Sequence, residues 1–138
     1  MISENIQRTI LPNGIRVLSE YVDSVYSVSL GFWIQAGSQD EEDNENGIAH
    51  LLEHMVFKGT HKRSAFAIAH EIESLGGIIN AFTSRNVTCF NVQLLHENLA
   101  KGVEVLSDLI LHGRLDPHEL EKEKRVICEE IREIEDTP

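Results

Sequence analysis

Cysteine and basic residues are scarce in this chain of 138 residues. The two cysteines, Cys89 and Cys128, are too few for the disulfide framework of a small secreted domain. They also lie far apart in the sequence, which excludes a cysteine-rich structural zinc site. We therefore expect both cysteines to fill the core, and the protein to work in a reducing compartment.

The shortage of positive charge excludes a second group of functions. Lys and Arg together number 12 against 23 Asp and Glu, for a net charge of −11. Nucleic acids and anionic membrane surfaces both favour basic partners, so we expect neither. No apolar run reaches transmembrane length, and residues 1–5 lack the basic and apolar parts of a targeting peptide. These absences predict a cytoplasmic protein.

The pattern of apolar residues predicts one α+β domain. Strands that come before and between helices, without regular βαβ alternation, favour a mainly antiparallel sheet with helices packed on one side. The Asn13-Gly14 pair is typical of a hairpin turn between the first two strands. The expected strands span residues 7–11, 15–21, 25–36, 77–83 and 87–95, and the expected helices follow the acidic loop 40–45, Ser64, Glu97 and Asp116-Pro117.

The acidic loop 40–45 allows two interpretations. Its negative charge suits the positive N-terminal end of the helix that follows, and such loops are usually solvated. A binding site for basic peptides is the alternative. We favour the solvated loop.

The most informative motif is His50-Leu51-Leu52-Glu53-His54. Residues four apart on a helix lie one above the other, so His50 and His54 can hold one ion while Glu53 points beside it, toward a bound water. The other residues near this motif are almost all apolar, which predicts a buried helix. This is the arrangement that a catalytic zinc ion needs.

The last helix carries two glutamates in an apolar face. A carboxylate in such a face is costly unless hydrogen bonds or a cation compensate it, and a zinc ion would do so. Two imidazoles, one carboxylate oxygen and a water make up a catalytic rather than a structural zinc site. Periodicity alone does not choose between the two glutamates as the third ligand. The residues of this face are Leu120, Glu123, Ile127, Glu130, Ile131 and Ile134.

The remaining histidines are expected at the surface, because each lies in a polar loop, at an element end or outside an apolar stripe. They are His61, His70, His96, His112 and His118.

The sequence resembles the inverzincins of the pitrilysin, or M16, family, including bacterial processing-protease-like members and the β subunit of the mitochondrial processing peptidase. The resemblance implies that His50, His54 and Glu130 bind zinc, that Glu53 is the base that activates water, and that Glu123 supports the site without being a principal ligand. It rests on Leu11 to Gly14, Ala36-Gly37-Ser38, Gly47 to Met55, Phe57-Lys58-Gly59-Thr60, Gly76-Gly77, Asn80-Ala81, Glu123 and Glu129-Glu130.

The activity implied by this resemblance is that of a zinc-dependent endopeptidase acting on peptides or unfolded, presequence-like polypeptides. The resemblance further implies that residues 77–83 form an exposed edge strand onto which an extended peptide is added. Asn80, Ala81, Phe82 and Thr83 would then contact the substrate. Without the resemblance, Asn80 would be an ordinary polar residue at a strand end.

The resemblance also bears on domain organisation. Residues 1–138 correspond to an N-terminal catalytic M16-type domain that is truncated and lacks the second homologous domain, so we expect a second domain or subunit as partner, a homodimer being one form of this. A non-catalytic peptide-binding or scaffold subunit is the alternative function. The intact set of His50, Glu53, His54 and Glu130 favours the peptidase. The lack of a transit-like segment favours a bacterial cytoplasmic protein over one of the mitochondrial matrix.

Overall fold

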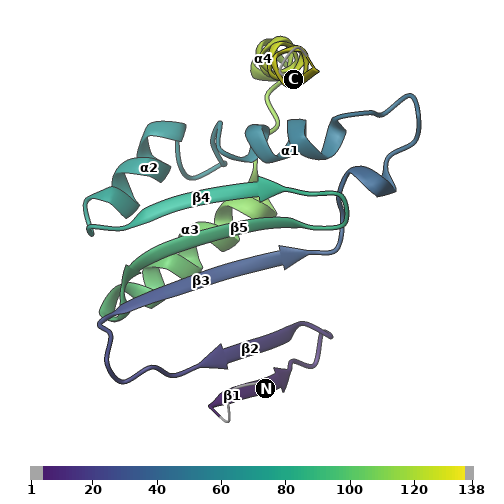
Figure 1. The fold of residues 1–138 in the computed structure, drawn as a ribbon. Helices are drawn as coiled ribbons and strands as arrows, with labels where there is room; N and C mark the ends of the chain where they lie inside the picture. Colours follow the sequence, from purple (N-terminus) through teal and green to yellow (C-terminus); the bar gives the residue numbers. More distant parts are fainter. Residues whose placement is uncertain (1–4, 136–138) are drawn as a thin grey trace.

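The computed structural model describes residues 5–135, with side chains up to residue 132. Strands and helices follow the order expected from the sequence, and their ends agree within a few residues (Figure 1). They are β1 (Ile6–Ile10), β2 (Arg16–Glu20), β3 (Ser27–Ile34), α1 (Ile48–Val56), α2 (Ala65–Glu73), β4 (Ile78–Thr83), β5 (Thr88–Leu95), α3 (Leu99–His112) and α4 (Pro117–Glu135), with short 3₁₀ turns at Ser38–Asp40 and His96–Asn98.

The five strands form two antiparallel sheets. Strands β1 and β2 form a hairpin, and its strand residues are all exposed. The larger sheet has the order β3-β5-β4, with β5 in the centre. Its register places Cys89 between Trp33 on one side and Phe82 on the other. Figure 1 shows the hairpin lying beyond β3, to which it is not hydrogen-bonded.

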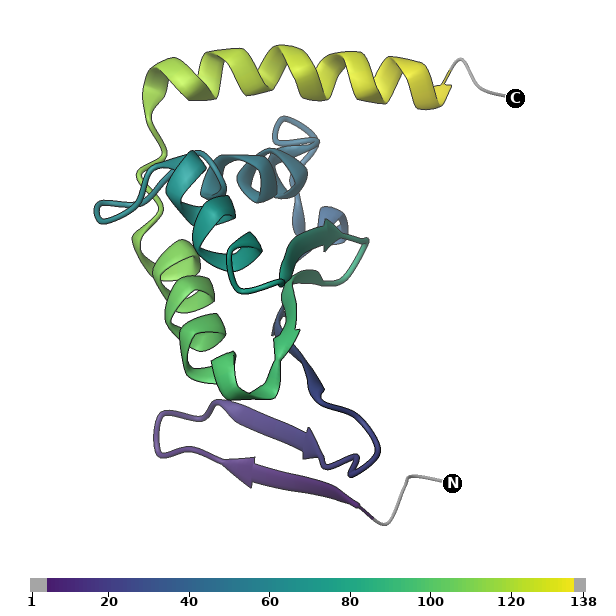
Figure 2. The same cartoon turned by 90° about the vertical axis from the view of Figure 1, so that its left-hand side faces the viewer.

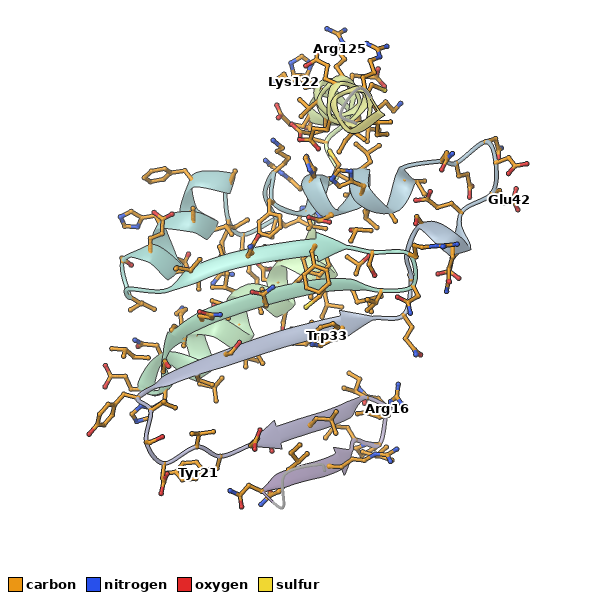
Figure 3. All side chains as sticks on the ribbon, viewed as in Figure 1. Arg16, Tyr21, Trp33, Glu42, Lys122 and Arg125 are labelled. Atoms are coloured by element: carbon orange, nitrogen blue, oxygen red, sulfur yellow. The ribbon has the colours of Figure 1, made fainter. Side chains whose placement is uncertain are left out.

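The helices lie on one side of the larger sheet, as expected. Helix α3 packs against β5 and β3, α1 and α2 pack against β4, and α4 packs against α1. Figure 2 shows this side-on, with α4 running across the top of the molecule. The opposite face carries Trp33, which is 65% exposed (Figure 3) and contacts the ring of Phe82 edge-on at 5.6 Å between centroids. None of the helices of residues 5–135 is both long enough and apolar enough to cross a bilayer.

The core lies between β5 and the helices. Alternate residues of β5 point toward α3, and each fully buried aliphatic or aromatic side chain contributes about 1.5–3 kcal/mol. Cys89 is buried as expected, but Cys128 is exposed because it lies next to Ile127, whose side chain occupies the buried face of α4. The core residues are Val56, Ile68, Ile72, Phe90, Val92, Leu94, Val105, Leu106 and Leu109.

Helix α1 is less buried than its composition predicts. Ile48 is 50% exposed and Leu52 is 49% exposed, and only Met55 and Val56 are buried. The prediction of a buried helix was therefore wrong. The reason is that α1 contacts β4, an outer strand of the sheet, and α4, rather than lying between two full layers. This position leaves the histidines of α1 accessible.

Candidate functional site

The start of α1 is fixed by a glutamate of the acidic loop. The carboxylate of Glu41 accepts hydrogen bonds from the backbone N–H groups of Gly47 and Ala49, both at 2.8 Å. Gly47 has a φ of 90°, a left-handed conformation that glycine adopts without strain. A carboxylate at this end of a helix also interacts favourably with its dipole. The loop thus supports the helix, and it places His50 in the first turn.

The two histidines of α1 converge on one carboxylate of α4. Oε2 of Glu130 lies 3.6 Å from Nε2 of His50 and 3.9 Å from Nε2 of His54. One ligand atom from each of the three residues falls within 4.8 Å of the others. Ligand atoms around a tetrahedral zinc are separated by about 3.3–3.5 Å, so a small inward movement would suit the ion. Two nitrogens and one oxygen are the kind of donor set found in catalytic zinc sites.

Glu123 contacts the other ring nitrogen of His54. Its Oε2 lies 3.0 Å from Nδ1 of His54, and its Oε1 lies 2.6 Å from Nζ of Lys58. Burial opposes ionisation of this carboxyl, but the hydrogen bonds from Lys58 and His54 outweigh it, so the pKa of Glu123 lies below its ordinary value. An ionised Glu123 favours the tautomer of His54 that carries its proton on Nδ1, and in that tautomer Nε2 can bind a metal.

A residue of the sheet holds the side chain of Glu53 in place. Oε2 of Glu53 accepts a hydrogen bond of 2.5 Å from the hydroxyl of Thr83, at the end of β4. Among the residues whose side chains are described, none forms a hydrogen bond with its Oε1. One oxygen of Glu53 is thus fixed by the protein, and the other is available to a water.

A groove of about 500 Å³ runs from Glu53, His54 and Glu123 to β4. It is lined by Glu53 and His54 at one end and by Asn80 and Ala81 along the strand. Within residues 5–135, β5 is the only strand paired with β4. The side-chain oxygen of Asn80 accepts a hydrogen bond of 2.8 Å from the N–H of Ala81. Phe82 points to the opposite face of the sheet, against Trp33.

The structure thus brings together five residues singled out from the sequence, and it adds two that sequence reasoning missed. The five are His50, Glu53, His54, Glu123 and Glu130. The two are Glu41 and Lys58. Thr83, expected to contact the substrate, also donates a hydrogen bond to Glu53. The histidines at positions 61, 70, 96, 112 and 118 are exposed, as expected.

Comparison with known families gives a match over most of the chain. The model of the family described as Insulinase (Peptidase family M16) matches residues 16–138.

Curated relatives carry matching names. The uncharacterized zinc protease YmxG of Bacillus subtilis is 44% identical over 133 residues, which cover 96% of this chain and 32% of that protein. The probable β subunit of the mitochondrial-processing peptidase of Arabidopsis thaliana is 42% identical over 127 residues, covering 92% of this chain and 24% of that protein. The chain therefore spans a third or less of the length of these relatives.

Solved structures give the same result for the fold. A protease from Helicobacter pylori superposes with a TM-score of 0.87 at 29% identity, over 92% of this chain and 31% of that one. The periplasmic protease PqqL from Escherichia coli gives a TM-score of 0.85 at 31% identity, over 98% of this chain and 16% of that one.

Proposed function

Because this chain belongs to peptidase family M16, we propose that it is the zinc-binding catalytic part of an endopeptidase acting on peptides or unfolded, presequence-like polypeptides. The observation that carries the proposal is the approach of one Glu130 oxygen to the Nε2 atoms of both His50 and His54. The names of the relatives, zinc proteases and processing peptidases, support it.

The geometry supports a role for each residue. His50, His54 and Glu130 would hold the zinc ion, and Glu123 would orient His54. When bound, zinc polarises the scissile carbonyl and lowers the pKa of a coordinated water. Glu53 would act as the base that accepts a proton from the attacking water and would later deliver it to the nitrogen of the leaving amine.

The hydrogen bond from Thr83 determines which carboxylate oxygen of Glu53 can act as the base. It holds Oε2 of Glu53 against the end of β4, so Oε1 is the oxygen that accepts the proton. Thr83 would therefore act on catalysis through Glu53 as well as lying beside the substrate.

The substrate binds as an extended strand along the outer edge of β4. Main-chain pairing of this kind accepts many sequences, which suits a peptidase of broad specificity. The N–H of Ala81 becomes available once the side chain of Asn80 turns away from it. Asn80 and Ala81 line the groove, and Thr83 ends the same strand, so these residues would lie along the bound peptide. Phe82 supports the strand by packing against Trp33.

We assign residues 1–138 to the N-terminal, incomplete part of a catalytic domain. The proposed partner is a second M16-type domain or subunit, which a second copy of the chain could supply, and which would cover the open groove. The complete set of ligands and base argues against the non-catalytic scaffold alternative. A cytoplasmic location stays a prediction from the sequence.

The test measures metal and activity together. Zinc is determined by elemental analysis after dialysis, and cleavage of a quenched-fluorescent peptide library is followed for the unsubstituted protein, Glu53→Gln and the control Glu42→Gln. Glu42 lies in the exposed part of the acidic loop (Figure 3). We expect one zinc ion per chain in all three proteins, and a loss of cleavage of about 100-fold or more in Glu53→Gln alone.

Three results would change the proposal. Absence of zinc would overturn the assignment of the ligands, and undiminished cleavage by Glu53→Gln would overturn the role of Glu53. Zinc without cleavage in any of the three proteins would locate the missing contribution in the second domain, and the same variants would then be compared in the full-length protein.

A further inference from the structure

Lys58 is the outermost member of a chain of contacts that leads to the zinc site. It lies two residues beyond the end of α1, and its Nζ is 2.6 Å from Oε1 of Glu123. The other oxygen of Glu123 is 3.0 Å from Nδ1 of His54. The backbone N–H of Lys58 donates to the carbonyl of Met55 at 3.1 Å, which fixes where its side chain starts.

The contact between Lys58 and Glu123 is important because Glu123 is buried. The side chain of Glu123 is 8% exposed, and a buried carboxylate is costly unless charged or polar groups surround it. Among the described residues, Lys58 and His54 are the only ones that form ion pairs or hydrogen bonds with it. Each occupies a different oxygen, so together they fix the rotation of the carboxylate plane.

From this geometry we propose that Lys58 is a positioning residue of the zinc site. It holds Glu123 in the orientation that accepts the Nδ1 proton of His54, and thereby keeps Nε2 of His54 turned toward Glu130. The inference rests on the proposed function, because it concerns the same zinc site. It adds a residue outside the His/Glu motif that tunes metal affinity through two intermediate side chains.

A purely structural role is the competing explanation. Lys58 also links the end of α1 to α4, so a substitution could lower stability without acting on the metal. The two explanations predict different effects of the Lys58 and Glu123 substitutions on zinc affinity. A residue that acts through Glu123 has no further effect on zinc affinity once the Glu123 carboxylate has been removed, whereas a residue that acts on stability alone does not change zinc affinity.

The experiment measures the zinc dissociation constant by competition with a chelator of known affinity at neutral pH. It uses the 138-residue protein, Lys58→Met, Lys58→Arg, Glu123→Gln and the double variant Lys58→Met/Glu123→Gln. Partners that orient a metal-binding histidine typically contribute 10-fold to 100-fold in affinity. We expect Lys58→Met to weaken zinc binding by about 10-fold and Lys58→Arg to stay within about 3-fold of the unsubstituted protein.

The double variant decides the mechanism. We expect it to bind zinc as weakly as Glu123→Gln and no more weakly. Equal zinc affinity in Lys58→Met and the unsubstituted protein, or effects of the two substitutions that simply add, would overturn the proposal. Lys124→Met is the matched control, because Lys124 pairs only with Glu121 on the exposed side of α4 in the described residues.

A stability measurement and a further variant distinguish an effect on zinc affinity from an effect on folding. Urea unfolding of each zinc-free variant shows which changes act on stability, and Lys58→Gln replaces Lys58→Met if the methionine variant does not fold. If the unsubstituted protein binds no zinc, the proposed function fails. If it binds zinc and the neutral Lys58 variants bind it equally well, only the role of Lys58 fails.

Discussion

Two clusters of charged residues, one around Arg63 between α1 and α2 and one between α1 and α4, are built differently. In the first, Arg63 donates hydrogen bonds to Asp108 at 2.7 Å, to Glu71 at 3.1 Å and to Glu104. In the second, Glu130 faces imidazoles alone among the described residues. The first cluster contains its own permanent cation, and the second does not.

This difference separates a structural cluster from a proposed metal site. Burial opposes the charge of Arg63, but hydrogen bonds with Asp108, Glu104 and Glu71 outweigh it, so the pKa of its guanidinium is raised and the charge is permanent. The imidazoles of the second cluster instead have ring nitrogens that can bind a metal ion. The side chain of Glu130 is 41% exposed and can be solvated without a cation, so folding should not depend on a bound metal ion.

Removal of a proposed zinc ligand should show most clearly that the second cluster serves metal binding and the first serves stability. We expect His50→Ala to abolish zinc binding while changing the free energy of unfolding of the zinc-free protein by less than about 1 kcal/mol, because His50 is half-buried and alanine favours helices. Elemental analysis and urea unfolding with chelator present give the two numbers. A large loss of stability without metal would contradict the separation.

Arg63→Met should do the reverse. It leaves Asp108 buried without its cation, and breaking such a pair costs about 3–5 kcal/mol. Urea unfolding measures the loss, and the protein that remains folded should still bind one zinc ion. Arg125→Met is the control, since Arg125 is exposed on α4 (Figure 3) and should change stability by less than about 0.5 kcal/mol. A loss below 1 kcal/mol in Arg63→Met would show that the cluster is not structural.

Acid should weaken the Arg63 cluster gradually. Burial raises the pKa of Asp108, but hydrogen bonds from Arg63 and Thr60 outweigh it, and the net pKa is lowered. The folded state then favours the ionised form, so this contribution to stability is complete above the ordinary carboxyl pKa of about 4 and is lost as the pH falls through the folded-state value. Unfolding of the zinc-free protein at a series of pH values should show a weaker acid dependence in Asp108→Asn. An unchanged acid dependence would contradict this.

Local signals predicted the element boundaries well. Ser64 accepts a hydrogen bond from the N–H of Ala67 at the start of α2, and Asp116 accepts one from the N–H of His118 at the start of α4. Both contacts join residues two or three positions apart, which is why the sequence alone could identify them. The His/Glu motif was identified for the same reason.

Contacts between distant segments could not be predicted in this way. Glu123 and Glu130 lie two turns apart on the same face of α4. Only the position of α1 against α4 determines that Glu123 faces Nδ1 of His54 and that Glu130 faces its Nε2. Likewise, nothing near Lys58 in the sequence indicates its contact with Glu123. The exposure of α1 was missed because composition does not tell whether a helix lies over the middle or the edge of a sheet.

The smallest expected effect concerns Glu41, which supports the zinc-site helix from outside both clusters. Glu41→Gln removes the charge at the start of α1 and weakens the two hydrogen bonds that Gly47 and Ala49 donate, so we expect a loss of about 1 kcal/mol in the free energy of unfolding. Urea unfolding measures this loss, with Glu42→Gln as the exposed control. Because His50 lies in the first turn, looser N-terminal hydrogen bonding should also weaken zinc binding, by less than the removal of Lys58 does. An equal loss in both glutamine variants would mean that the general charge of the loop, rather than the two hydrogen bonds of Glu41, supports the helix.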